Sequence, residues 1–363
     1  MKNHQDPNWL SRLIYPSGAV AAAWLIFLCL LIPGWFCLSA PQASQDLLNR
    51  AQQALDANRL EEACGLIREI LSIEKDNHLA RKALVDVLMR MMRWDEAERE
   101  IATLRSIYPK DAQTAFLAAA VAFRLGNYSQ AVDLSTEAYN LEDPSIEALR
   151  IRALSRFMIQ DYDGFEKDMR TFADLDPRNP EPHYHLGRYY FEKQMFTDSR
   201  NELQQAIEKS PRHYRAYYYL GWCQRAGGEL EKAKESYLKS VEIILQDGAS
   251  FGWPFADLGE LLITQDRFEE GLIWLFRAVR NDPDLPYAHF KYASALFKKE
   301  TTSEVESELR KAIELDPGYT EAYYVLANYY RKSGNRELAM EALKKFQELR
   351  KNPVASPFGV RRN

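Results

Sequence analysis

One period runs through most of this 363-residue sequence. Small or apolar residues mark one position of each period, and they recur after 34 positions five times, then after 38 once, then after 34 twice. These markers are Ala51, Val85, Ala119, Ala153, Gly187, Gly221, Gly259, Ala293 and Ala327. A fixed period of this length predicts a repeat architecture in which each unit packs against its neighbours, with no single large core.

Three further positions keep the same phase and predict a pair of packed helices in each repeat. A bulky residue follows the marker by nine positions and a second small residue follows it by 12, as Tyr128 and Ala131 illustrate. Small residues allow two helices to approach closely, and the bulky residues fill the space between neighbouring pairs. Proline, which cannot continue a helix, stands 24 positions after five of the markers. The single spacing of 38 predicts four extra residues near 242–250, about one additional turn of a second helix.

The residues in these positions resemble the tetratricopeptide repeat (TPR) signature. The resemblance rests on Tyr217 to Gly221 followed by Ala233 and Tyr237, and on Phe255 to Gly259 followed by Gly271, Ala278 and Pro283. It implies an all-α fold, a right-handed superhelix (α-solenoid) of about nine helix-turn-helix repeats. The expected repeats are 44–77, 78–111, 112–145, 146–179, 180–213, 214–251, 252–285, 286–319 and 320–353, with a tail at 354–363. The eighth repeat departs from the pattern, and the polar last helix (336–351) is expected to cap the array.

An uncharged stretch, residues 18–38, precedes the repeats, after a polar segment (1–17) and before a linker (39–43). Its length suits either a transmembrane anchor or the core of a cleaved signal peptide, and both readings stay open. Lys2 and Arg12 precede the stretch, and only Arg50 follows closely. That distribution favours a cytoplasmic N-terminus and repeats outside the cytoplasm, so the expected location is the periplasm, membrane-anchored or released.

Composition and motifs give no sign of catalysis or of nucleic-acid binding. The formal net charge is −5 with mixed signs, whereas nucleic-acid binding calls for a basic stripe. No metal-protease, paired-cysteine, phosphate-loop or hydrolase motif occurs, so no catalytic residue, metal site or cofactor is predicted. His183 and His289 occupy the same repeat position, and their spacing favours packing over metal ligation.

The expected binding surface is the concave groove that first helices line in TPR superhelices. Carrying the family's groove positions over to repeats five to nine gives Tyr184, Arg188, Phe191, Tyr218, Trp222, Arg225, Trp253, Glu260, Tyr287, Phe290, Phe297, Tyr324, Asn328 and Arg331. Aromatic residues and arginine dominate protein interfaces, so an extended segment of a partner protein is the expected ligand. The alternative is that several of these aromatic residues cover neighbouring helices.

The sequence therefore predicts a non-catalytic scaffold that binds other proteins. The leading hypothesis is a bacterial envelope scaffold that organises a pilus, secretion or envelope-biogenesis assembly, with the membrane as a further partner if residues 18–38 are retained. A cytoplasm-facing membrane TPR adaptor and a glycan-binding TPR protein are the alternatives. The layout is similar to lipopolysaccharide-assembly TPR proteins, but those end in a cysteine-rich metal domain and this chain has no cysteine after Cys223.

Overall fold

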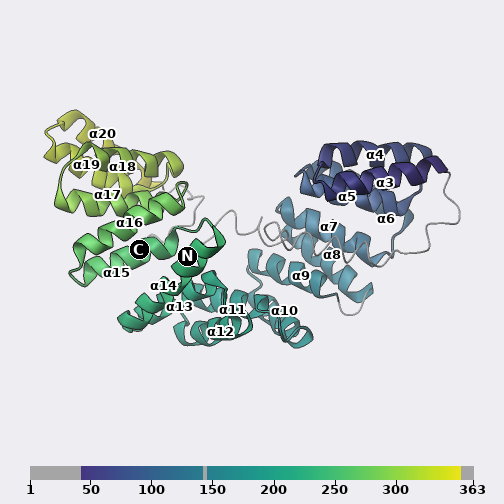
Figure 1. Ribbon diagram of the computed structural model, residues 1–363, viewed down its shortest axis with the longest axis horizontal. Helices are drawn as coiled ribbons and strands as arrows, with labels where there is room; N and C mark the ends of the chain where they lie inside the picture. The colour runs from purple at the N-terminus through teal and green to yellow at the C-terminus, as the bar shows by residue number, and fades with distance from the viewer. Residues whose placement is uncertain (1–41, 142–144, 353–363) are drawn as a thin grey trace. The chain divides into compact units, whose positions relative to one another are not determined.

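The computed structural model describes residues 42–141 and 145–352. Within these ranges every regular element is an α-helix, and the helices run from α3 to α20 (Figure 1). They divide between Pro182 and His183 into two compact units, each built from consecutive helix pairs. The predicted apolar segment 18–38 and the tail 354–363 lie outside the described residues. None of the described helices is long and apolar enough to cross a bilayer.

The first unit contains four pairs, and in each pair an odd-numbered first helix is followed by an even-numbered second helix. They are α3 (Gln42–Asp56), α4 (Leu60–Ile73), α5 (His78–Arg90), α6 (Trp94–Ile107), α7 (Ala112–Arg124), α8 (Tyr128–Leu141), α9 (Ile146–Met158) and α10 (Tyr162–Leu175). The first helices α5, α7 and α9 begin at equal intervals along the chain, and that interval is the period of the sequence.

The second unit contains five pairs and carries all the predicted groove residues. They are α11 (Glu181–Glu192), α12 (Phe196–Lys209), α13 (Tyr214–Ala226), α14 (Leu230–Asp247), α15 (Trp253–Thr264), α16 (Phe268–Asn281), α17 (Pro286–Lys299), α18 (Ser303–Leu315), α19 (Thr320–Lys332) and α20 (Arg336–Lys351). As predicted, α14 is the lengthened second helix, with 18 residues against 14 in α12 and α16.

Close approach of the two helices explains the small marker residues. A Cβ atom on Gly221 of α13 would lie 2.6 Å from the ring of Tyr237 on α14. On Gly259 of α15 it would lie 2.7 Å from the carbonyl oxygen of Gly271 on α16. Both distances are shorter than real Cβ contacts allow, so glycine at these markers sets the spacing of the pair.

The turn inside each pair uses a left-handed residue that the sequence pattern did not reveal. The residue seven positions after the marker has a positive φ in eight of the nine pairs: Asn58, Met92, Gly126, Gln160, Gln194, Gly228, Asp266 and Gly334. The exception is the degenerate eighth repeat, where Glu300 has a φ of −153°. Helix starts are stabilised separately, since Asn77, Asp111 and Ser145 accept hydrogen bonds from backbone N–H groups in the first turns of α5, α7 and α9.

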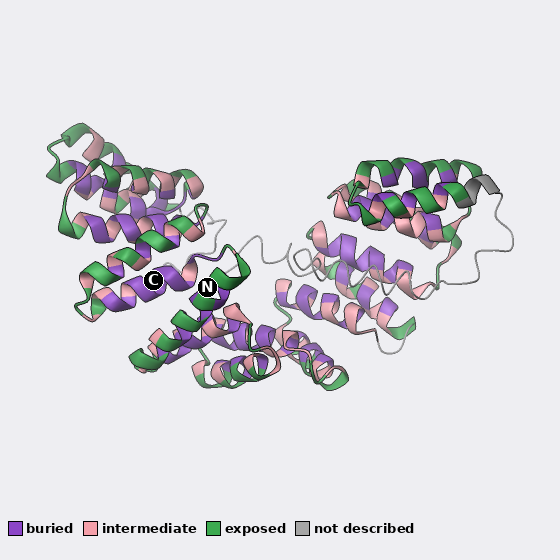
Figure 2. Ribbon diagram, in the orientation of Figure 1, coloured by how far each residue is buried: buried purple, intermediate pink, exposed green. Residues whose placement is uncertain are grey.

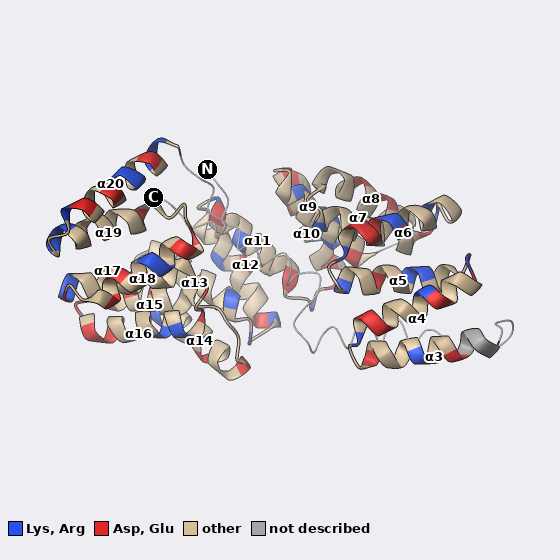
Figure 3. Cartoon of the chain, turned by 90° about the horizontal axis from the view of Figure 1, so that it is seen from above, with Lys and Arg blue, Asp and Glu red and all other residues tan. Residues whose placement is uncertain are grey.

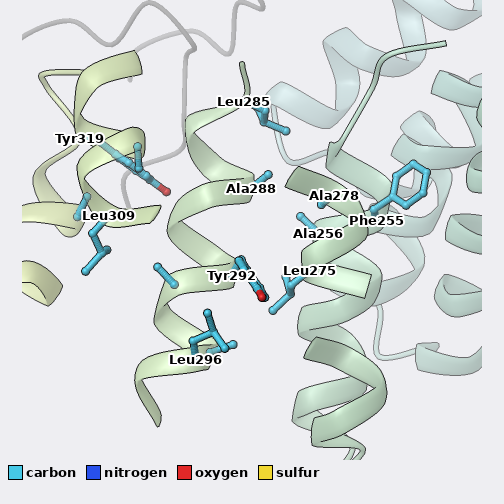
Figure 4. Close-up of a cluster of buried hydrophobic side chains, with 14 of the residues drawn as sticks. Phe255, Ala256, Leu275, Ala278, Leu285, Ala288, Tyr292, Leu296, Leu309 and Tyr319 are labelled. Atoms are coloured by element: carbon cyan, nitrogen blue, oxygen red, sulfur yellow. The ribbon is translucent and has the colours of Figure 1, made fainter. Parts of the chain in front are cut away.

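Buried residues lie on the helix faces turned toward neighbouring helices, and exposed ones lie on the outer faces (Figure 2). In the second unit one continuous cluster extends from α13 to α20. Figure 4 shows part of it, where Leu275 and Ala278 of α16 lie in the same cluster as Ala288 and Tyr292 of α17. The core is thus distributed along the stack, as expected for a repeat protein.

Candidate functional site

The predicted groove residues all lie on the first helices of the second unit, namely α11, α13, α15, α17 and α19. They fall into three groups with different surroundings: residues buried in the stack, residues bonded to one another, and residues that line an open hollow.

The α11 residues belong to the buried group. Tyr184, Arg188 and Phe191 are all buried. Phe191 packs edge-on against Trp222 of α13, with ring centres 5.8 Å apart, and Arg188 donates a hydrogen bond to Glu192. For α11 the alternative therefore holds, because each side chain fills the space next to the following first helix.

Three groove residues are joined by one carboxylate, Asp257 of α15. Tyr218 donates its hydroxyl to Asp257 at 3.0 Å, and Trp222 donates its indole N–H at 2.7 Å. Tyr287 of α17 donates to the other carboxylate oxygen at 2.7 Å. Asp257 is 1% exposed and Tyr218 is also buried, so the alternative reading, a side chain that covers a neighbouring helix, holds for Tyr218 too. This network ties three successive first helices together.

Burial and hydrogen bonding act in opposite directions on this network. Burial raises the pKa of the Asp257 carboxyl, while the hydrogen bonds from Tyr287 and Trp222 favour its charged form. Burial, together with the nearby Asp257 charge, raises the pKa of Tyr218 and Tyr287, so both hydroxyls remain protonated donors. Sequence reasoning missed Asp257. Its only signal is an acidic residue inside the otherwise apolar run from Trp253 to Leu258.

A chain of charges runs beside the network on the same first helices. Glu260 of α15 bonds Arg225 of α13 at 3.1 Å and also pairs with Lys291 of α17. Burial acts to raise the pKa of Glu260, but Lys291 and Arg225 together hold it below its usual value. Trp253 stacks on Tyr287 with ring centres 4.7 Å apart. Arg225, Glu260 and Tyr287 are partly exposed, yet each is bonded through its polar group inside the unit.

The third group forms an open hollow of about 470 Å³ at α17 and α19. It is lined by Phe297, Tyr324, Asn328, Arg331 and Lys332, of which the first four are predicted groove residues. We call these five residues the α17–α19 hollow. Tyr324 is 49% exposed, and the Lys332 ammonium lies 5.3 Å from the centre of the Phe297 ring. Phe290 lies outside the lining and packs against Tyr319.

The two cations of the α17–α19 hollow differ from most basic residues of the unit. Acidic and basic side chains are interspersed along the helices (Figure 3). Many of them form ion pairs, such as Arg225 with Glu260. Within the part of the chain that the structure describes, neither Arg331 nor Lys332 forms an ion pair with a carboxylate. The hollow therefore combines accessible aromatic surface with uncompensated positive charge.

The two histidines that share a repeat position form equivalent bonds to glutamates. His183 bonds Glu202 at 2.8 Å and His289 bonds Glu308 at 2.5 Å, in both cases through Nδ1. The Nε2 atom of His289 also lies 2.8 Å from the carbonyl oxygen of Pro283. Burial acts to lower the pKa of His289, but the bonds to Glu308 and Pro283 outweigh it and hold this pKa above its usual value. Both histidines thus link the first helix of a pair to its second helix.

Comparison with known proteins agrees with this fold. Three segments match models of the tetratricopeptide repeat, residues 54–121, 184–247 and 320–353. The chain is 23% identical over 265 residues to the TPR repeat-containing protein YpiA of Bacillus subtilis. The aligned region covers 72% of this chain and 61% of that protein. The chain is also 24% identical over 219 residues to tetratricopeptide repeat protein 37 of Xenopus laevis, and that aligned region covers 58% of this chain and 14% of the relative. The chain therefore spans about three fifths of the Bacillus relative and a small part of the Xenopus one.

Solved structures support the fold. A tetratricopeptide repeat protein from Parabacteroides merdae superposes with a TM-score of 0.54 at 14% identity, covering 75% of this chain and 100% of that one. Pseudomonas aeruginosa pilF gives a TM-score of 0.50 at 14% identity, covering 62% of this chain and 95% of that one. With the three matched segments, the TPR-named relatives and the helix pairs that repeat with the sequence period, this chain is a tetratricopeptide repeat protein.

Proposed function

We propose that this protein is a scaffold that binds an extended segment of a partner protein on the first-helix face of its second unit, with the α17–α19 hollow as the main contact. TPR proteins generally mediate protein–protein interactions, and the fold and the relatives point to a repeat scaffold without catalytic activity. The observation that carries the proposal is the hollow itself. It offers a half-exposed tyrosine, an asparagine and two cations with no carboxylate partner among the described residues.

The surroundings of the other predicted groove residues narrow the contact surface to this end of the unit. Tyr218, Trp222 and Tyr287 already donate to Asp257, and Arg225 already pairs with Glu260. A ligand would gain little from polar groups that are already satisfied, because it would have to break an existing bond to form a new one. Tyr324, Asn328 and Arg331 carry no such cost, and tyrosine and arginine are frequent hot-spot residues.

Site-specific photocrosslinking in the native host tests this assignment. A crosslinker at position 324 should capture a defined protein, and one at the exposed Phe276 of α16 should not. Arg331→Glu should reduce the captured amount at least tenfold, a change that corresponds to about 1.4 kcal/mol. Arg280→Glu, a charge reversal at another exposed arginine, serves as the matched control and should leave capture unchanged. Equal capture at both positions, or no effect of Arg331→Glu, would contradict the proposed contact.

We propose further that the repeats work outside the cytoplasm in a bacterial envelope, where they organise a pilus, secretion or envelope-biogenesis assembly. The support is the uncharged segment 18–38 with Lys2 and Arg12 before it. A fusion of alkaline phosphatase after the repeats should be active in bacteria, because that enzyme needs an oxidising compartment. An inactive but intact fusion would favour the cytoplasm-facing adaptor instead. N-terminal sequencing of the mature protein then separates an anchor from a cleaved signal peptide.

A further inference from the structure

The last helix, α20, leaves two positions incompletely buried that every earlier second helix buries. In α20 these positions are Leu343 and Phe346, which follow the marker Ala327 by 16 and 19 positions. The equivalent pairs are Ile67 and Ile70, Ile101 and Leu104, Ser135 and Ala138, Met169 and Phe172, Leu203 and Ala206, Tyr237 and Ser240, Leu275 and Ala278, and Leu309 and Ala312, all of them buried. Leu343 is 39% exposed and the neighbouring Met340 is 66% exposed, whereas Phe346 is half-buried and packs on Tyr324 of α19, with ring centres 5.2 Å apart.

The next first helix accounts for the burial in the earlier pairs. Leu275 and Ala278 of α16 share their cluster with Ala288 and Tyr292 of α17 (Figure 4). Leu309 and Ala312 of α18 lie in the same cluster as Ala322 and Leu326 of α19. In both cases the covering helix presents a small residue and, four positions later, a large apolar one. α20 packs on α19, and no described helix follows it.

The first helix of the array, α3, has polar residues at the corresponding positions. At the two positions where α17 has Ala288 and Tyr292, α3 has Asp46 and Arg50. Both side chains are exposed and lie 3.8 Å apart as an ion pair. The α3 end is therefore polar and offers no apolar complement to α20, which argues against head-to-tail stacking of copies. The polar last helix that was expected to cap the array thus also carries two exposed apolar side chains, Met340 and Leu343.

We propose that the face of α20 formed by Met340 and Leu343 binds an amphipathic helix of a partner protein. The recurring α16–α17 and α18–α19 contacts define what fits there: a helix with a small residue followed four positions later by a large apolar one. Arg336, Lys344 and Lys351 lie along the same side of α20 as Met340, at helical spacing, and form no ion pair among the described residues. The bound helix therefore carries acidic residues along its edge. Met340 and Leu343 share no residue with the α17–α19 hollow, whereas Phe346 packs on Tyr324 of its lining and is left out of this second surface.

A helix-stapled, fluorescently labelled peptide with the sequence of residues 252–266 is a suitable probe. It contains Pro254 and Leu258 at the small and large positions, three acidic residues and no lysine or arginine. The peptide should bind the full-length protein saturably in fluorescence anisotropy. The same peptide with Leu258→Asp should not bind, because the apolar contact is replaced by a charge that must be desolvated.

Paired variants of the protein distinguish binding at this face from non-specific binding to exposed apolar side chains. Met340→Ser/Leu343→Ser should raise the dissociation constant at least tenfold, because two apolar side chains no longer become buried on binding. Leu238→Ser/Leu245→Ser on α14 is the matched control, since these leucines are 39% and 59% exposed, and it should leave binding unchanged. Arg331→Glu should also leave it unchanged, which keeps this test independent of the hollow.

Three outcomes would overturn the proposal. One is the absence of saturable binding, and another is an equal loss of affinity in the α20 and α14 variants. The third is self-association of the wild-type protein in sedimentation that Met340→Ser/Leu343→Ser abolishes, because a second copy would then be the occupant of this face.

Discussion

Asp257 shows at the scale of single residues how much one buried carboxylate contributes to the second unit. It accepts hydrogen bonds from Tyr218, Trp222 and Tyr287, which come from two other first helices. Asp257→Ala should lower the free energy of unfolding by about 2–4 kcal/mol, because one buried donor and two half-buried donors lose their acceptor. Asp257→Asn should cost less, since one acceptor oxygen remains. Urea denaturation checks both, and an equal cost for the two variants would contradict the network's role.

His289 contributes to the stability of the folded protein in a pH-dependent way, and the direction of that dependence follows from its hydrogen bonds. Both ring nitrogens lie within hydrogen-bonding distance of acceptors, Glu308 and the Pro283 carbonyl, and this arrangement favours the doubly protonated imidazolium. The raised pKa means that its stabilising contribution is fully present below the ordinary value of 6.5 and is lost as the pH rises through the folded-state value.

His289→Gln should therefore cost more stability at about pH 6 than at about pH 9, with a difference of roughly 1 kcal/mol. Thermal unfolding of both proteins at the two pH values measures it. Glu308→Gln is the control, because it should abolish most of the pH dependence without removing the histidine. A cost of His289→Gln that is independent of pH would show that the ring is neutral in the folded protein.

At the scale of helices and turns, the left-handed turn residue gives a test within matched repeats. Met92 has a φ of 60° and is 68% exposed, whereas Glu300 at the same repeat position has an extended φ of −153°. Met92→Gly should raise the free energy of unfolding by about 0.5–1 kcal/mol, because glycine adopts this conformation without steric cost. Glu300→Gly should lower it by a similar amount through chain entropy. Urea denaturation decides, and the same sign for both changes would contradict the turn assignment.

The helix pairs were predictable from sequence because their signals are local. Gly221 and Ala233 allow close packing of the two helices of one repeat, and Pro283 ends a helix. Each effect acts within a single repeat. The extra turn of α14 could be located from a single change in spacing. The turn conformation at Met92 and Gln160 could not be predicted, because neither residue type signals a positive φ.

The candidate site was less predictable because its decisive contacts join different repeats. The partners of Asp257 lie 30, 35 and 39 residues away in sequence, so no local pattern pairs them. The predicted groove residues lie on first helices, but the sequence does not separate Tyr184, which is buried, from Tyr324, which is half-exposed. That difference depends on whether a following repeat covers the side chain.

At the scale of the whole molecule, the stacked pairs predict stability that is local and not uniform. Each repeat contacts only its neighbours, so a destabilising change should affect nearby repeats and fade along the stack. Asp257→Ala should increase hydrogen exchange in α13, α15 and α17. Asp168→Ala should do so in α9 and α10, because buried Asp168 accepts hydrogen bonds from Arg152 and Arg156 of α9.

Hydrogen exchange followed by mass spectrometry on the full-length protein resolves these two patterns. Each variant also controls for the other, since both remove one buried carboxylate, and they do so in different units. Faster exchange in α3 and α4 after Asp257→Ala would mean that the array unfolds as one cooperative unit. Exchange that changes only around the altered residue would instead show that the second unit can lose structure locally while the first unit stays folded, as expected for a stack of repeats.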